Sequence, residues 1–452
     1  MHRVGWKIFA VKWMTLFAIF SVMLLNACDN SAEADADETT SSLQSSGSKA
    51  KSSSSKKAYP DSFKPNDKEY PYANIPRIVI YTENQQEIKD RETEIPAKLQ
   101  IWGKKEAETE IFDLTIRGRG NSSWKIMPKK SYKIEFEKKQ AVLGMPKDKD
   151  WALIANYADK TLMKNFIAYR LSAALGAYYA PRCEFAELYL NGEYLGVYLL
   201  TETIKVGKNR VNIFQSDSSY IVEFDAKYRE NEQVVFSDVL TEDGIGKAFR
   251  IHNPKNATET SLGFLQDNIQ KFEKFLKSIE NGRNNKIDVW IDVDESIKHY
   301  WVQEITKNPD AGFYTSVFFS WVKGGKIKLG PVWDFDIAFG NSVDQSLNTY
   351  KSFIIRNCYW NKYLFRDSLY KKTVDDFWKR NKSLVVDFLD SIETVQEKLR
   401  LPAQNNFIRW RILEDTTAQW HPKFYKKYDD AVDDLKEWLS ERIQWIGSEI
   451  KK

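Results

Sequence analysis

The chain has 452 residues, of which 42% are hydrophobic and 29% are charged, enough for a large buried core and two or three domains. Three of its 67 Lys and Arg residues lie in the first 28 positions, which hold no acid, so the remainder carries 64 basic against 63 acidic residues. This near neutrality argues against a nucleic-acid-binding protein.

The first 28 residues are typical of a secretory signal, because a basic start precedes an apolar run over residues 14–25. Leu25-Asn-Ala-Cys28 resembles the lipobox of bacterial lipoproteins, in which Cys28 would carry the lipid and become the first residue. An uncleaved anchor helix is the alternative, although the run is short for a membrane span. We therefore expect an extracytoplasmic, membrane-anchored lipoprotein, in the periplasm or at the cell surface.

Residues 29–58 are rich in Ser, Ala and Lys without apolar periodicity, which predicts a flexible tether before a globular part over residues 59–452. Cys183 and Cys358 lie in that globular part. Outside the cytoplasm they can form a disulfide. Two buried free thiols fit equally well, because sequence spacing says nothing about proximity.

Strands are predicted over residues 75–81, 95–102 and 112–117, from their β-branched and aromatic residues. The third strand runs into a Gly-containing loop over residues 117–124. Its two glycines, beside Asn and Ser, can bring backbone N–H groups close to an anion. Most loops of this kind are ordinary turns.

The next strand is predicted over residues 128–136. Its aromatic and aliphatic residues alternate from Tyr132 to Phe136 and so share the buried face. Lys130 has the same parity, which predicts that it points inward at the mouth of the strand, whereas Lys129 points outward. Lys130 then fits two roles, a phosphate-binding lysine and an edge lysine whose ammonium group reaches solvent.

A helix is predicted over residues 159–176, followed by a hairpin over residues 185–200 whose Asn-Gly centre favours a type I′ turn. Glu202 stands where the apolar strand of the hairpin stops, and a strand over residues 220–225 also contains acids. Each of these acids fits a functional role and a salt bridge at the edge of the core equally well.

Further helices are predicted over residues 261–281 and 291–305. The second leads to Asp310, and a hairpin then leads to Asp334 and Asp336. Carboxylates at the end of a buried strand are costly unless a cation pairs with them, and hard oxygen ligands suit Mg²⁺. A metal site fits this stretch as well as a simpler role, in which the acids cap a turn or pair with arginines.

From residue 364 onward the chain is predicted to be mostly helical, with a last helix over residues 429–450 whose apolar stripe packs into the core. His299 falls within a predicted helix, as an ordinary packed or surface residue. No Cys/His cluster has the spacing of a zinc site, and no histidine after the signal lies near a nucleophile motif.

The order of these elements is that of a protein kinase, in which a Gly-rich loop, an inward lysine and two acidic loops follow one another. The residues themselves resemble the CotH kinase family. The matching segments, in the family's order, are Arg117-Gly-Arg-Gly-Asn-Ser-Ser-Trp124, Lys129-Lys130-Ser-Tyr132, Trp151-Ala-Leu-Ile-Ala-Asn156, Leu188-Tyr-Leu-Asn-Gly-Glu-Tyr-Leu-Gly-Val-Tyr-Leu-Leu-Thr-Glu202, Asn308-Pro-Asp310, Gly330-Pro-Val-Trp-Asp-Phe-Asp336 and Trp438-Leu-Ser-Glu-Arg-Ile-Gln-Trp445.

This resemblance implies an α+β, atypical protein-kinase-like fold. Its mostly β N-terminal lobe would span about residues 70–225, and its mostly α C-terminal lobe about residues 260–450. The resemblance also implies ATP with Mg²⁺, or with Mn²⁺ in its place, and phosphorylation of Ser residues in secreted or cell-surface proteins.

Residue by residue, the resemblance implies that Lys130 binds the ATP phosphates and that Asp310 is the acid of the catalytic loop. It also implies that Asp334 binds the metal ion, with Asp336 as a further ligand.

The same resemblance would place Arg119 and Asn121 in the phosphate loop and Glu202 at the hinge between the lobes. The chain departs from ordinary kinases because it has no His-Arg-Asp motif. Thr315 also stands five residues after the catalytic acid, where those kinases have a metal-binding Asn. The hydroxyl of the following residue, Ser316, would be a weaker metal ligand.

Two other functions stay open. A non-catalytic cell-surface scaffold, or pseudokinase, would account for the missing Asn. A carbohydrate-active enzyme would use Asp334 and Asp336 as its pair of carboxylates, but it would leave Lys130 and the Gly-containing loop without a role.

Overall fold

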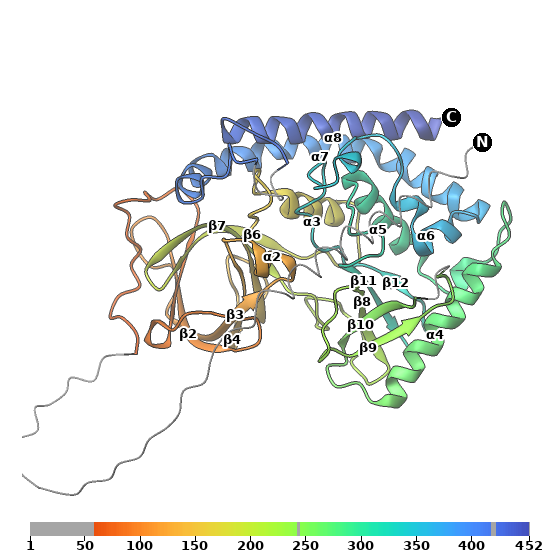
Figure 1. Cartoon of the computed structure of the whole chain (residues 1–452), viewed down its shortest axis with the longest axis horizontal. Coiled ribbons are helices and arrows are strands. Elements are labelled where there is room, and N and C mark those ends of the chain that lie inside the picture. Colours follow the sequence, from red (N-terminus) through yellow and green to blue (C-terminus); the bar gives the residue numbers. More distant parts are fainter. Residues whose placement is uncertain (1–57, 242–244, 417–421, 452) are drawn as a thin grey trace, which may run out of the picture. The chain divides into compact units, whose positions relative to one another are not determined.

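Seven strands form a closed barrel in the first half of the computed structural model, which describes residues 58–241, 245–416 and 422–451 (Figure 1). The strands are antiparallel to their neighbours except β1 and β6, which close the barrel in parallel. Around the barrel their order is β1 (Arg77–Thr82), β2 (Ile95–Trp102), β3 (Phe112–Arg119), β4 (Ser131–Gln140), β5 (Asp148–Ile154), β7 (Glu193–Glu202) and β6 (Cys183–Leu190).

Alternation of buried and less buried residues along the strands explains how the interior of this barrel is filled. In β2, β3 and the first part of β4, every second residue is buried, as expected for strands with one face toward a core. The buried face of β4 includes Tyr132, Ile134 and Phe136, as predicted. The predicted hairpin is also confirmed, because Asn191 and Gly192 both have positive φ, as a type I′ turn requires.

A second sheet of five antiparallel strands follows the barrel. Its central strand β8 is buried along its whole length. The order across the sheet is β12 (Lys328–Leu329), β11 (Val317–Val322), β8 (Ser219–Phe224), β10 (Lys247–Asn253) and β9 (Val234–Ser237). The strand predicted over residues 220–225 therefore pairs with strands that come later in the chain, and not with the barrel.

Seven helices are described, and with the two sheets they make an α+β fold. Three of the longer ones begin at a side-chain cap, from Thr258, Asp292 and Asp367. The helices are α2 (Ser122–Ile126), α3 (Lys164–Ala174), α4 (Glu259–Ser278), α5 (Val293–Thr306), α6 (Tyr359–Leu364), α7 (Ser368–Arg409) and α8 (Tyr428–Lys451). Short 3-10 turns lie at Glu83–Gln85, Ile287–Val289, Gln345–Leu347 and Ile355–Asn357.

The long helix α7 packs along α8 and reaches the barrel with its last turns (Figure 1). The buried side chain of Asn406 accepts hydrogen bonds from the backbone N–H of Val197 at 3.1 Å and from Lys129 Nζ at 2.9 Å. The expectation that Lys129 points outward is therefore wrong. Trp410, just after α7, donates to the carbonyl of Leu195 at 3.0 Å, so the helix is tied to strand β7.

Both cysteines of the described part are free thiols. Cys183 is buried and Cys358 is partly buried, with no disulfide between them. The structure thus decides between the two possibilities that the sequence leaves open. The predicted signal, Cys28 and the tether up to residue 57 lie outside the described residues. Within the described ranges, no helix combines the length and the apolar character of a membrane span.

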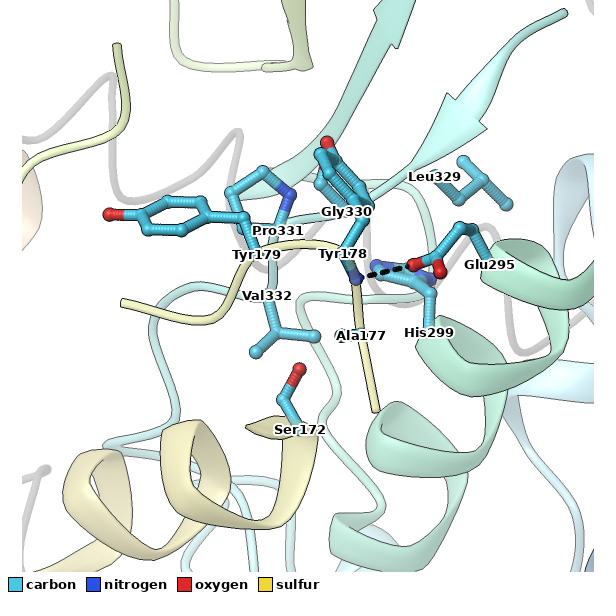
Figure 2. A pocket seen from close by; sticks show the side chains of 10 residues that line it. All are labelled: Ser172, Ala177, Tyr178, Tyr179, Glu295, His299, Leu329, Gly330, Pro331 and Val332. Carbon is cyan, nitrogen blue, oxygen red and sulfur yellow. Dashed lines mark hydrogen bonds between the residues drawn. The ribbon is translucent and has the colours of Figure 1, made fainter. Parts of the chain in front are cut away.

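His299 lies on α5 beside a small pocket of about 10 Å³, which has room for about one water molecule (Figure 2). Beside it, the Glu295 carboxylate accepts a hydrogen bond from the backbone N–H of Tyr178 at 2.9 Å. The imidazole is 6% exposed, and burial lowers its pKa from the usual 6.5 to about 4. Protonation of His299 is therefore unfavourable in the folded protein.

This burial predicts an acid-sensitive contribution to stability. The unfolded chain takes up a proton on this imidazole below pH 6.5, whereas the folded chain does so only near pH 4. The free energy of unfolding should therefore fall by about 3 kcal/mol between these pH values because of His299 alone. Urea unfolding at several pH values should show this slope in the native protein and a shallower one in His299→Gln. Parallel pH profiles would contradict the prediction.

Candidate functional site

Three aspartates come together from two loops. Asp310 lies in the turn that follows α5, and Asp334 and Asp336 follow β12. The carboxyl groups of Asp334 and Asp336 share a hydrogen bond. Burial and the charge of Asp334 raise the pKa of Asp310 to about 7, and burial together with the charges of Asp334 and Asp310 raises the pKa of Asp336. The two acidic loops, which bracket one hairpin in the sequence, are thus close enough for the charges of their carboxyl groups to act on each other.

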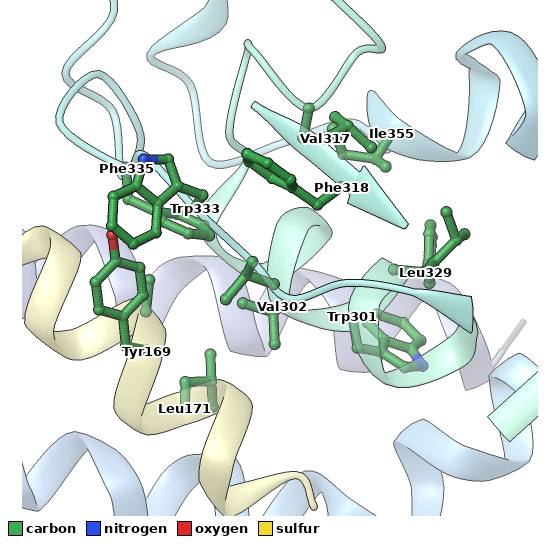
Figure 3. Close-up of a cluster of buried hydrophobic side chains, with 14 of the residues drawn as sticks. Tyr169, Leu171, Trp301, Val302, Val317, Phe318, Leu329, Trp333, Phe335 and Ile355 are labelled. Carbon is green, nitrogen blue, oxygen red and sulfur yellow. The ribbon is translucent and has the colours of Figure 1, made fainter. Parts of the chain in front are cut away.

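The position of Asp334 is fixed by its neighbours. Trp333 and Phe335 are buried in the cluster between α3, α5 and β11, where Trp333 stacks on Tyr169 with 5.6 Å between ring centroids (Figure 3). The side chain of Asn308 donates to the carbonyl of Asp334 at 2.9 Å. The loop after α5 and the loop after β12 are therefore held together by a direct hydrogen bond.

The backbone is unusual at this place. Phe313, Ser316 and Asp334 all have φ near +60°, in the left-handed region. Residues other than Gly adopt this region at a cost, which the surrounding structure must offset, and such residues cluster at functional sites. Two of these positions follow Asp310 and the third is Asp334 itself, so both acidic loops contain strained backbone.

Two cations face these carboxylates. Arg119, at the end of β3, lies over the ring of Trp333 with 4.9 Å to its centroid, and its charge lowers the pKa of Asp334. Lys227 follows β8, and its charge lowers the pKa of both Asp310 and Asp334. Burial still outweighs these charges, because the pKa of each acid is raised.

A buried network behind the aspartates holds the segment that contains Ser316. Glu223, on β8, accepts from the backbone N–H of Ser316 at 3.1 Å and pairs with Arg250 at 2.7 Å. His252 Nε2 lies 2.7 Å from the same carboxylate. Asp225 accepts from the Thr315 hydroxyl at 3.1 Å. Thr315, which stands where ordinary kinases have a metal-binding Asn, is thus bonded to an acid of this network.

The residues at this site fit a magnesium ion that also binds phosphate. In the described residues, no group of three or more His, Cys, Asp or Glu side chains can hold a metal ion by itself. Mg²⁺ is, however, commonly held by one or two carboxylates together with phosphate oxygens and water. Asp334 and Asp336 supply two carboxyl groups that lie within hydrogen-bond reach of each other, and a divalent cation would offset the repulsion between their ionised forms.

The structure does not bring every predicted residue to this cluster. Lys130 donates to the carbonyl of Trp124 at 2.6 Å and lies over its ring, at 5.5 Å from the centroid. Asn121 accepts from Arg91 at 2.9 Å at the start of α2. Among the interactions of the described residues, neither side chain contacts the three aspartates.

The contacts of Glu202 are those of a residue that stabilises the fold. Its carboxylate is fully buried at the end of β7 and pairs with Arg182 at 2.7 Å and with Arg210. The hydroxyl of Tyr179 donates to it at 3.1 Å. Of the two roles that the sequence allows, the salt bridge at the edge of the core is the one that these contacts form.

Comparison with known proteins shows the family of this chain. A family model described as CotH kinase protein matches residues 116–446, which include Arg119, Lys227 and the three aspartates. The chain is also 23% identical over 389 residues to the inner spore coat protein H of Bacillus subtilis (strain 168), with 83% of this chain and 97% of that protein covered. The match of the family model over most of the chain shows that it belongs to the CotH kinase family.

Proposed function

We propose that this protein is an atypical protein kinase that transfers the γ-phosphoryl group of ATP to Ser residues of secreted or cell-surface proteins, with Mg²⁺ or Mn²⁺. In this proposal the barrel is the N-terminal lobe, and the second sheet with its helices is the C-terminal lobe. The proposed lipid on Cys28 would hold the enzyme at a membrane. The observation that carries the proposal is the meeting of Asp310, Asp334 and Asp336 opposite two cations.

Each side chain has a role in that reaction. Asp310 accepts the proton of the attacking Ser hydroxyl or orients that hydroxyl, and Asp334 and Asp336 would hold the metal ion. The ion neutralises charge on the phosphates when it is bound. As the bond from the serine oxygen to the γ-phosphorus forms, the bond from that phosphorus to the β,γ-bridging oxygen breaks, and ADP leaves. Arg119 and Lys227 are placed to stabilise the negative charge that develops on the transferred group.

A pseudokinase scaffold is the second candidate, and one observation favours it. Lys130, which the family resemblance assigns to ATP, is bonded to the Trp124 carbonyl and not to the acidic cluster. A scaffold of this kind would bind its partner without transferring phosphate. A carbohydrate-active enzyme is less well supported, because Arg119 and Lys227 would then have no chemical role.

Transfer from labelled ATP distinguishes these functions. The purified full-length protein is incubated with a Ser-rich peptide in Mg²⁺, in Mn²⁺ or in a chelator, and label on the peptide or on the protein is counted. We expect label with a metal ion only, and a loss of about 10²-fold or more in Asp310→Asn, in which nucleotide binding persists. Asp267→Asn, the same change at an exposed site on α4, serves as the control. Nucleotide binding without any transfer would favour the scaffold.

A further inference from the structure

The two cations at the acidic cluster come from opposite halves of the structure. Arg119 belongs to β3 of the barrel, whereas Lys227 follows β8 of the second sheet. The family resemblance points to Arg119 and Lys130 as the cations of the site, and no sequence pattern points to Lys227. The surroundings of Lys227 are therefore the clearest feature of the site that the family resemblance leaves unassigned.

The main chain at Lys227 is anchored to the buried network. Its backbone N–H donates to Asp225 Oδ1 at 2.9 Å. The Asp225 carboxylate, in turn, accepts from the Thr315 hydroxyl at 3.1 Å and lies 2.9 Å from a guanidinium nitrogen of Arg250. Because these contacts hold the base of the lysine in place, only its side chain needs to move to meet a ligand.

The ammonium group of Lys227 reaches toward the barrel. Its Nζ lies 3.3 Å from the hydroxyl of Ser122, the first residue of α2, and 5.2 Å from the centroid of the Tyr314 ring. Ser122 belongs to the Gly-containing loop that the resemblance places over the phosphates. One cation thus lies between that loop and the loop of Asp310, and its charge also acts on the Asp334 carboxylate.

Lys130 has a different environment. Its ammonium group donates to the carbonyl of Trp124, a residue of α2, at 2.6 Å. Lys130 precedes β4, which begins at Ser131, and the Trp124 ring below its ammonium group packs against Tyr132 of that strand. Among the described contacts it has none with a residue of the acidic cluster.

We propose that Lys227, and not Lys130, is the lysine that binds the phosphates of the nucleotide. This inference rests on the proposed function. The ammonium group would contact phosphate oxygens between the Gly-containing loop and the aspartates, and it would balance the charge that grows on them during transfer. Lys227 would contribute to binding only through contacts with phosphate oxygens. The affinity for a nucleoside without phosphates should therefore not depend on this residue.

Matched lysine variants test the inference. We measure binding of ATP and of adenosine, and the rate of transfer, in the native protein and in Lys227→Met, Lys227→Arg and Lys130→Met. We expect Lys227→Met to weaken ATP binding about tenfold or more, to leave adenosine binding unchanged and to lower transfer about 10²-fold. Lys227→Arg should recover part of both losses, and Lys130→Met should stay within about threefold of native.

The controls separate this inference from the proposed function. Thermal unfolding of each variant shows whether it is folded, and unchanged adenosine binding shows that the site is intact. If Lys130→Met loses ATP binding and Lys227→Met does not, the assignment of Lys227 is wrong while the kinase function stands. If the native protein binds no ATP with either metal ion, both proposals fail.

Discussion

Asp334→Asn is expected to lower the rate of phosphoryl transfer by about a thousandfold or more, and to raise the thermal stability of the metal-free protein. The rate falls because an amide is a poorer ligand for Mg²⁺ than a carboxylate and leaves the charge of the phosphates less well neutralised. Stability rises because burial and the charge of Glu223 raise the pKa of Asp334, so its ionised form is unfavourable in the folded state.

Asn is the right replacement at this position. Asp334 has φ of +62°, and Asn tolerates the left-handed region better than Ala does. The change therefore removes charge without adding backbone strain. Asp267→Asn on the exposed face of α4 should alter neither quantity. An Asp334→Asn protein that is less stable than native without metal, or that keeps more than a tenth of the activity, would argue against a metal-binding role.

Arg442→Met is expected to lower the free energy of unfolding by about 3–5 kcal/mol, because it leaves a buried carboxylate unpaired. Arg442 on α8 and Glu304 on α5 are both fully buried and lie 2.9 Å apart. The guanidinium group also donates to the carbonyls of Tyr350 and Ser352, each at 2.7 Å. One side chain therefore joins α8, α5 and the segment that follows the aspartates.

Denaturant unfolding measures this effect. Arg400→Met is the matched control, because Arg400 is 43% exposed and its ion pairs lie at the surface, so a change below about 1 kcal/mol is expected. The double variant Glu304→Gln/Arg442→Met should be more stable than Arg442→Met alone, since it removes the unpaired charge and keeps an oxygen that can accept from the backbone N–H of Ile354 or Arg356. A double variant that loses the sum of the two single effects would show that the pair contributes little.

The sequence predicts the barrel strands better than the second sheet. Strands β2, β3 and β4 alternate clearly because one face is buried and the other meets water. β5, β9 and β10 are not predicted. β9 has only four residues, and β10 gains its stability by pairing with β8, more than twenty residues earlier in the chain. Such pairing depends on the whole sheet, which a local pattern does not contain.

The residues of the candidate site are likewise predicted only in part from the sequence. The order of helix, hairpin and acidic loops singles out the three aspartates, and in the structure their charges act on one another. Lys129 is placed wrongly by parity, because it precedes β4 and the alternation of a strand does not apply before it begins. No sequence pattern points to Lys227. Its position near Asp310 is set by the pairing of β8 with β11, which is not visible in the local sequence.

The end of α7 has a consequence for motion within this fold. In the described chain, β7 leads to β8 through one connecting segment, and α7 supplies a second link through Asn406 and Trp410. A rotation of the barrel about that connection would have to break these hydrogen bonds or bend a 42-residue helix. Because α3, between β5 and β6, also packs against α5 and α7, the joint is stiff, and exchange of the proposed nucleotide would depend on local movement of the Gly-containing loop and not on opening of the whole molecule.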